Sequence, residues 1–163
     1  MNITVGRVPP RSREEISGWL QQQRFTHFIT LTTHNPSITI ARMRERLKQF
    51  DARLNRALYG PKWASHKDQL IWFFAFIESP ETNPHWHLLL TLDHTPVADK
   101  LIDTTLLEEH IRDVWLRLAP AGTVDVKEIH GKIDGLLTDY VGKQLVHVPQ
   151  YSSFVTPDEF RRL

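Results

Sequence analysis

Hydrophobic and polar residues follow two periods along this chain, and these periods divide it into expected strands and helices. Strict alternation, or a short run rich in Phe, Thr, Ile and Leu, predicts a β-strand because such residues suit a pleated, half-buried surface. The expected strands are 25–33, 69–77, 85–92 and 123–129. Apolar residues three and four positions apart predict amphipathic helices. The expected helices are a short one that opens near 11–15 and longer ones at 37–59, 105–118 and 133–145.

The order of these elements predicts the fold class. After the opening helix the order is β-α-β-β-α-β, followed by a last helix. This is the ferredoxin-like split arrangement, an α+β fold whose antiparallel sheet carries two helices on one face. We expect the extra N- and C-terminal helices to cover the other face or to leave it free, and the tail from residue 150 to be a partly ordered extension. Since 1–163 contains no internal repeat or linker, we expect a single domain with its core at about 25–145.

Composition narrows the class of protein. The chain of 163 residues is 40% hydrophobic and 24% charged, which is typical of a globular domain and excludes collagen-like and wholly disordered chains. No apolar run approaches the length of a membrane span, and the first residues do not resemble a secretory signal, so we expect no membrane partner and no secretion. The chain has no cysteine. Any metal must therefore be held by His, carboxylate, amide or water, which favours hard divalent cations or zinc.

The charges are balanced in total but segregated along the chain. There are 20 Lys and Arg against 19 Asp and Glu. Residues 41–68 contain eight basic and three acidic residues, whereas 93–139 contain ten acidic and five basic residues. A local basic surface can attract nucleic acid even when the whole chain is near neutral. Arg42, Arg46 and Arg53, on the expected helix 37–59, are therefore candidate DNA contacts, and the alternative is an ordinary solvated helix face.

A His-x-His pair suggests a metal site. Side chains alternate across a strand, so His85 and His87 share one face of the sheet, about 7 Å apart, and Trp86 points to the other face. Glu78 ends the preceding strand, close to where the chain returns as His85, and can supply a third ligand. Two imidazoles and a carboxylate suit Mg²⁺ or Mn²⁺ with positions left open for water. With nine histidines in the chain, a chance pair of strand histidines is the alternative.

Two further groups of residues accompany the pair. Tyr140, Lys143 and Gln144 project from one side of the expected last helix. A tyrosine can act as a covalent nucleophile, and a nearby lysine favours its phenolate or neutralises a phosphate. A surface Tyr–Lys pair is the alternative. Thr30 and Thr32 in the first strand share the face of the histidines and can bond to a DNA backbone or support the ligands, although threonines are also good strand formers.

Taken in order, these pieces resemble the HUH superfamily of nucleases that nick single-stranded DNA, and most of all its rolling-circle replication initiators, the Rep proteins. Three motifs carry the resemblance: Phe28-Ile29-Thr30-Leu31-Thr32-Thr33, His85-Trp86-His87 and Tyr140-Val141-Gly142-Lys143. They span most of the chain, about 25–145. Trp86 is bulkier than the usual middle residue of the second motif. The helicase domain that many relatives carry is not evident, so a helicase is expected as a separate partner.

The resemblance implies a function. Tyr140 would attack a phosphodiester of single-stranded DNA or of a hairpin at an origin, and would form a 5′-phosphotyrosine with help from Lys143. Glu78, His85 and His87 would hold Mg²⁺ or Mn²⁺. Host replication proteins are further expected partners. The expected location is the cytoplasm of a prokaryote or, for a protein of a eukaryotic virus, the nucleus.

Other interpretations remain open from the sequence. Single-tyrosine transposases of the same superfamily place a metal-ligating Gln four residues after the tyrosine, and Gln144 has that spacing. The chain can also be a catalytically silent DNA-binding module of the same fold. Finally, it can be a small metal-binding protein in which the motifs coincide by chance.

Overall fold

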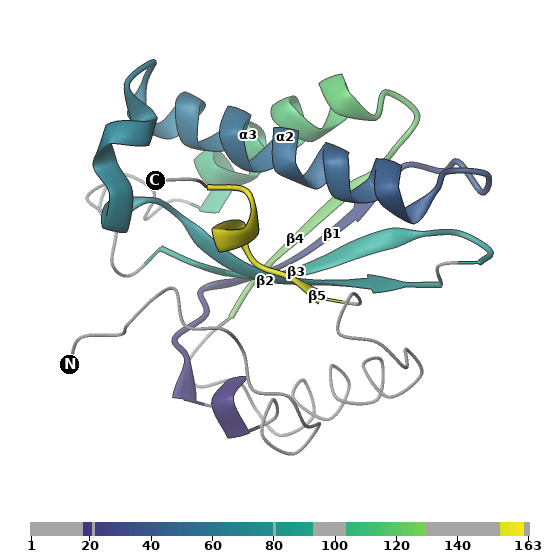
Figure 1. The fold of residues 1–163 in the computed structure, drawn as a ribbon, viewed down its shortest axis with the longest axis horizontal. Helices are drawn as coiled ribbons and strands as arrows, with labels where there is room; N and C mark the ends of the chain where they lie inside the picture. The colour runs from purple at the N-terminus through teal and green to yellow at the C-terminus, as the bar shows by residue number, and fades with distance from the viewer. Residues whose placement is uncertain (1–17, 21, 80, 93–103, 130–153, 162–163) are drawn as a thin grey trace.

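The computed structural model of the protein describes residues 18–20, 22–79, 81–92, 104–129 and 154–161 (Figure 1). Its strands are β1 (His27–Thr32), β2 (Trp72–Glu78), β3 (His85–Thr91), β4 (Val124–Glu128) and β5 (Phe154–Val155). Its helices are α2 (Ile40–Tyr59) and α3 (Thr104–Leu118), with 3₁₀ segments η1 (Trp63–Gln69) and η4 (Pro157–Glu159). The protein therefore has an α+β fold. The last helix expected at 133–145 and the start of the opening helix near 11–15 lie outside the described residues, whereas residues 18–20, which follow that start, are described and helical.

The five strands form one antiparallel sheet in the order β4-β1-β3-β2-β5. The expected adjacency of the first and third strands is confirmed, and β3 lies between β1 and β2. In this register Thr30 is opposite His87, and both Thr32 and Glu78 are opposite His85. Residues that are directly opposite in neighbouring strands share a face of the sheet. The register therefore gathers these polar side chains on one face.

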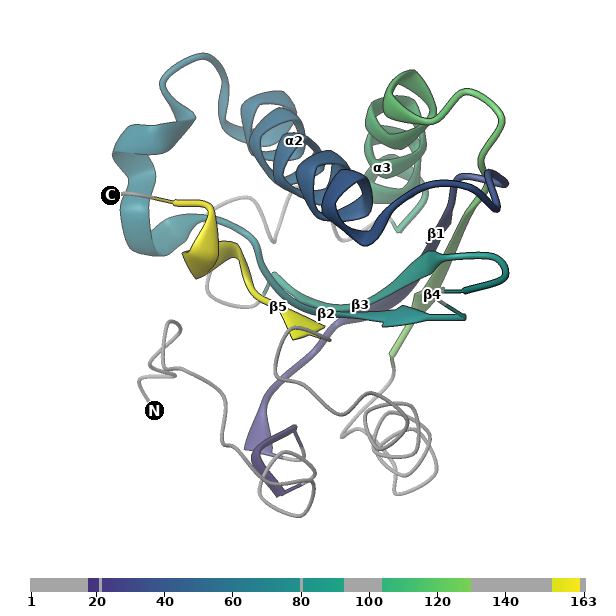
Figure 2. The same ribbon diagram turned by 45° about the vertical axis from the view of Figure 1, so that its right-hand side comes forward.

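Helices α2 and α3 lie side by side on the other face (Figure 2). The α2 helix begins after Thr39, whose side chain accepts a hydrogen bond from the Arg42 backbone amide at 3.2 Å. It ends at Gly60, whose φ of 85° lies in the left-handed region that favours glycine. No helix in the described part of the chain has the length and apolar character needed to cross a bilayer.

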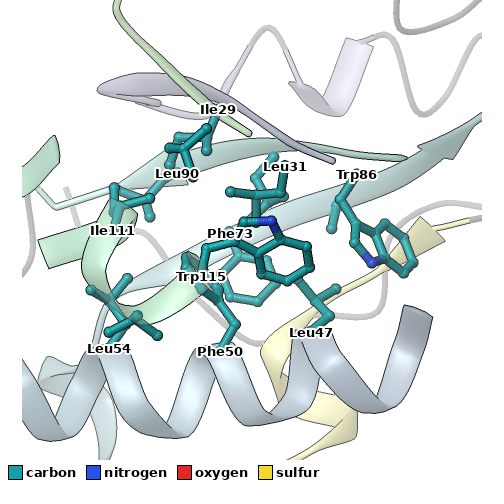
Figure 3. Packing of buried hydrophobic residues seen from close by; sticks show 14 of the residues in the cluster. Ile29, Leu31, Leu47, Phe50, Leu54, Phe73, Trp86, Leu90, Ile111 and Trp115 are labelled. Atoms are coloured by element: carbon teal, nitrogen blue, oxygen red, sulfur yellow. The ribbon is translucent and has the colours of Figure 1, made fainter. Parts of the chain in front are cut away.

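The main core fills the space between the helices and the sheet (Figure 3). From α2 it takes Met43, Leu47, Phe50 and Leu54; from α3, Ile111 and Trp115; and from the sheet, Ile29, Leu31, Phe73, Leu88 and Leu90, among others. Trp86 is fully buried in this core, and its indole N–H donates to the Met43 backbone carbonyl at 3.0 Å. Trp86, the bulky residue between the two histidines, thus points to the helix side of the sheet. The alternation of side chains along a strand predicts this direction.

A second, smaller cluster lies on the opposite face. It consists of Leu20, Phe25, Trp72, Phe74, Phe76 and Leu89, with Trp19, Phe28, Ile129 and Phe154 packed against it. The helical turn at 18–20 lies below the sheet in Figure 1, away from α2 and α3. Aromatic and aliphatic side chains therefore cover the part of the histidine-bearing face where β2 begins.

Two sequence expectations need correction. The second strand was expected at 69–77, but it begins at Trp72 because Gln69 belongs to the preceding 3₁₀ segment, where its carbonyl accepts a hydrogen bond from the Tyr59 hydroxyl at 2.5 Å. No strand was predicted in the tail from residue 150, which was expected to be a partly ordered extension, but Phe154–Val155 forms the strand β5, which pairs with β2.

The segment after β5 is fastened to the helix side of the fold. The Arg161 guanidinium donates to both carboxylate oxygens of Asp51, at 3.1 and 2.6 Å, and to the Ile71 carbonyl at 2.6 Å. Asp158 accepts a hydrogen bond from the Trp72 indole at 2.9 Å. These buried or half-buried contacts explain why residues 154–161 form a regular part of the fold.

We expect Gly122→Ala to destabilise the protein by about 2–3 kcal/mol, because overpacking forces the backbone to shift. A Cβ atom at Gly122 would lie 2.1 Å from the Thr32 carbonyl oxygen, which accepts a hydrogen bond from the Trp115 indole at 2.8 Å. Urea unfolding measures the change. Gly18→Ala is the control, since nothing lies within 4 Å of a Cβ atom there. Equal free energies of unfolding for the two variants would contradict the prediction.

Candidate metal centre

The three predicted metal ligands meet at the hairpin between β2 and β3. Glu78 is the last residue of β2, and His85 and His87 are the first and third residues of β3. Ser79 follows with a φ of 50°, in the left-handed region, and its carbonyl accepts hydrogen bonds from the amides of Thr82 and Asn83 at 3.2 and 3.1 Å. This turn reverses the chain directly after Glu78. Its register sets the carboxylate opposite His85.

The ligand atoms are close enough to share one ion. One carboxylate oxygen and one nitrogen from each imidazole all lie within 4.8 Å of one another. The Glu78 Oε2 atom is 3.0 Å from His85 Nε2 and also contacts His87 Nε2. The three side chains are 21%, 16% and 8% exposed, respectively. The group is therefore partly sheltered by the protein and still open to solvent on one side.

The far nitrogens of the two imidazoles are held by the surrounding structure. His85 Nδ1 is 2.8 Å from the Asn83 backbone carbonyl. Because a carbonyl only accepts, this nitrogen carries the hydrogen, which leaves Nε2 as the ring atom that could bind a metal ion beside Glu78. His87 Nδ1 shares a hydrogen bond with the Thr30 hydroxyl at 3.0 Å. Hydrogen bonds of this kind are typical of histidines that bind metals, where they fix the ring and its tautomer.

Two phenylalanines hold the plane of the His87 ring. Phe28 from β1 stacks on it with a centroid distance of 5.2 Å and an angle of 17°, and Phe76 from β2 lies at 5.3 Å and 36°. His85 meets His87 edge-on at 4.9 Å. The inner ligand thus has a hydrogen bond in its plane and aromatic neighbours from both adjacent strands, so its rotation is restricted.

The electrostatic environment keeps His87 neutral. Burial lowers the pKa of His87 below its ordinary value of 6.5, and His85 and Lys127 act in the same direction, although the Glu78 carboxylate opposes the shift. A neutral imidazole is the form that binds a metal. Imidazole lone pairs directed at a carboxylate repel it unless a proton or a cation lies between them. The group can therefore hold a metal ion, and its donors fit a divalent cation with open coordination positions.

The other predicted site residues lie in different places. Thr30 is beside the ligands, whereas the Thr32 hydroxyl lies 2.7 Å from the Thr123 hydroxyl and accepts a hydrogen bond from the Thr123 amide at 2.8 Å. Thr32 thus fastens the loop before β4. The predicted DNA contacts Arg42, Arg46 and Arg53 are on α2, which covers the opposite face of the sheet. Their role in DNA binding stays a prediction. The predicted catalytic residues Tyr140 and Lys143, and the candidate ligand Gln144, lie outside the described residues.

Three features of the site were not anticipated from the sequence. Phe28 and Phe76 lie two residues before Thr30 and Glu78 in their strands, so the alternation of side chains already assigns them to the same face. Their contact with His87 follows from the register. The Asn83 carbonyl carries no such signal, because its direction depends on the backbone of the turn.

We expect Thr30→Val to lower the affinity for Mn²⁺ by about tenfold or more, because the His87 imidazole loses its hydrogen bond while the side-chain volume is kept. His87→Ala, which removes a ligand, should have a larger effect. Calorimetric titration with Mn²⁺ measures both. Thr32→Val is the matched control, since Thr32 lies on the same face of the same strand but is bonded to Thr123. If the two threonine variants lose equal affinity, the hydrogen bond to His87 does not support metal binding.

We expect His87 in the metal-free protein to titrate below 6.5, which NMR of the imidazole signals can measure. The unfolded chain binds this proton more tightly than the folded protein. The neutral His87 therefore stabilises the folded protein by its full amount above pH 6.5. This stabilisation is lost as the pH falls through the lowered pKa. His87→Gln should flatten that part of the stability curve. A midpoint at or above the ordinary value would contradict the prediction.

Comparison with known proteins adds no further assignment. No family model, no curated protein and no solved structure matches this chain. The geometry of the centre and the motifs of the chain are therefore the basis on which a function is inferred.

Proposed function

We propose that this protein is a metal-dependent endonuclease of the HUH type, which nicks and rejoins single-stranded DNA to initiate rolling-circle replication. The observation that carries the proposal is the convergence of Glu78, His85 and His87 on the sheet face opposite the two helices. In the HUH interpretation this is the position of the cation beside the scissile phosphate. The pairing of an H-x-H strand with an acidic residue at the end of the neighbouring strand is difficult to explain by strand propensity alone.

The order of the elements supports the finer fold assignment that this proposal requires. Along the chain β1, α2, β2, β3, α3 and β4 follow one another, and in the sheet these strands have the order β4-β1-β3-β2. Both helices lie on one face. We therefore assign the core to the ferredoxin-like split β-α-β-β-α-β arrangement, extended at the edge by β5.

The proposed reaction uses a protein nucleophile. A divalent cation, Mg²⁺ or Mn²⁺, held by Glu78, His85 and His87 would supply Lewis-acid polarisation of the scissile phosphate. The Tyr140 phenolic oxygen attacks the phosphorus in line, the bond to the 3′ oxygen breaks, and this oxygen takes up a proton as the 3′-hydroxyl leaves. Lys143 favours the phenolate or neutralises charge on the phosphate. The 5′-phosphotyrosine keeps the energy of the phosphodiester, so a 3′-hydroxyl can later reseal the strand without a nucleotide cofactor.

The face around the centre suits an unpaired strand. Phe28 and Thr30 are half-buried there, beside the ligands. An aromatic ring that is partly exposed offers a surface on which a base can stack, irrespective of its identity. The proposed substrate is single-stranded DNA or the loop of a hairpin at an origin, and helicase activity would supply unpaired DNA for continued replication.

The test is covalent capture. We expect the protein to form an adduct with a single-stranded oligonucleotide in Mn²⁺, visible as a band of lower mobility in a denaturing gel. Tyr140→Phe should abolish the adduct and leave DNA binding unchanged, because only the attacking oxygen is lost. Tyr59→Phe is the control, since the Tyr59 hydroxyl donates to the Gln69 carbonyl on the helix side of the fold and should not take part.

Each other result selects a different interpretation. An adduct that persists in Tyr140→Phe means that another residue is the nucleophile. DNA binding without cleavage on many origin-like sequences favours a silent DNA-binding module, and the absence of both metal and DNA binding favours coincidental motifs. The alternative of a single-tyrosine transposase rests on the spacing of Gln144, and a severe loss of Mn²⁺ affinity in Gln144→Ala would support it.

A further inference from the structure

The outer side of α2 carries a stripe of four arginines. Arg42, Arg46, Arg53 and Arg56 are separated by four, seven and three residues, so at 100° per residue they lie on one side of the helix. Arg42, Arg53 and Arg56 are exposed and Arg46 is half-buried. Gln49 occupies the middle of the stripe. At 1.5 Å per residue the stripe is about 21 Å long.

The ion pairs of α2 and α3 involve arginines other than those of the stripe. On the adjacent helix α3, Arg112 pairs with Glu108 at 2.8 Å and Arg117 pairs with Asp113 at 3.3 Å, so two of the three acids of α3 pair within their own helix. On the other side of α2 it is Arg44 that pairs with Glu159, at 2.6 Å. Among the described residues, no ion pair includes a member of the stripe.

The single exposed acid of α2 does not neutralise the stripe. Glu45 accepts a hydrogen bond from Gln49 at 3.4 Å, and the only other acid of the helix, Asp51, is buried against Arg161. Three exposed arginines and the half-buried Arg46 thus lie along one line with one exposed acid beside them. Such an arrangement favours a ligand with several negative charges in a row.

The chemistry of the stripe favours phosphates of nucleic acid over a membrane surface. A guanidinium group binds a phosphate through two parallel hydrogen bonds. A helix that lies on a lipid surface needs large apolar residues next to its basic ones, but Leu106 of α3 is the exposed large hydrophobic residue in the described part of the chain, and α2 contributes none. Duplex DNA carries a negative charge about every 1.7 Å along its axis, so the stripe is long enough to contact several phosphates.

The position of the stripe determines which part of the DNA it can meet. Helices α2 and α3 cover one face of the sheet (Figure 2), and His85 and His87 lie on the other face because they alternate with Trp86, which is buried in the main core on the helix side. The main core and the sheet therefore separate the candidate metal centre from the outer side of α2. An unpaired strand on the centre cannot contact the stripe at the same point. We propose that the arginine stripe of α2 binds the backbone of double-stranded DNA, such as a hairpin stem beside the nicking site. This proposal rests on the proposed function for its choice of DNA.

The experiment measures binding of a fully paired, fluorescent duplex of about 20 base pairs by anisotropy, in EDTA so that metal binding does not contribute. We expect Arg42→Gln/Arg53→Gln to bind at least tenfold more weakly at low salt. The slope of log K against log salt concentration should decrease by about 2, because each lost phosphate contact removes about 0.9. Arg112→Gln/Arg117→Gln is the matched control: it removes the same charge from α3 and should change affinity by less than about twofold.

Two further measurements test whether any loss of binding comes from the lost charges and not from unfolding of the variant. Arg42→Lys/Arg53→Lys should retain the salt slope, and thermal unfolding should show that all three double variants are folded. Equal weakening in the α2 and α3 variants would overturn the proposal, since it would indicate only general attraction. Binding to vesicles rich in anionic lipid that is as strong as binding to the duplex, and is lost in the same α2 variant, would also overturn it in favour of a membrane.

The test of the duplex site can fail or succeed independently of the test of the proposed nicking function. The Arg42→Gln/Arg53→Gln variant should still form the covalent adduct with a short unpaired oligonucleotide. If the wild type binds the duplex through the stripe but never forms an adduct, the nicking function fails and the duplex site stands. If the adduct forms and duplex binding does not depend on these arginines, only the duplex site fails.

Discussion

The register of β3 between its two neighbours is the constraint on which the candidate site depends. It sets His87 beside Thr30 and Phe76, and His85 beside Thr32 and Glu78. A slip by one residue would turn both imidazoles into the apolar core and expose the indole between them. Trp86 opposes that slip, because it is fully buried and its N–H is bonded to the Met43 carbonyl. The residue that separates the ligands therefore also fixes the face on which they lie.

The histidine-bearing face is buried at one end and exposed to solvent at the other. At one end of β2, Trp72 and Phe74 are buried in the second cluster, and at the other end Glu78 is half-exposed. Phe76 lies between these ends and packs against His87. Aromatic side chains thus limit the motion and solvation of the inner imidazole, which lowers its pKa, while Glu78 and His85 at the strand ends remain partly exposed to solvent. The proposed function, a metal centre that receives a substrate, needs both properties.

The contacts of the last described residues show where sequence interpretation fails. Asp51 has the appearance of an ordinary charged residue of an amphipathic helix, yet it is buried with Arg161, which is 110 residues away. A pair of charges that is buried must be well hydrogen-bonded, and here the Ile71 carbonyl and Asn55 complete the bonds. No local pattern identifies such partners, so neither the strand β5 nor the pairing of Asp51 with Arg161 was predicted.

The sequence by itself determined the type and order of the described helices α2 and α3 and of strands β1 to β4, and the face on which His85, His87, Thr30 and Thr32 lie, but it predicted neither β5 nor the 3₁₀ segments η1 and η4. It could do so because alternation in a strand and a 3.6-residue period in a helix are local properties of the chain. It also indicated Glu78 as a third ligand, since a hairpin returns the chain to its own end. Only the tertiary structure decided the ring contacts of Phe28 and Phe76, the Asn83 carbonyl behind His85, and the separation of the α2 arginines from the metal centre. These depend on strand register, on the backbone of a turn and on which face of the sheet a helix covers, and each is fixed by burial between segments that are distant in the sequence.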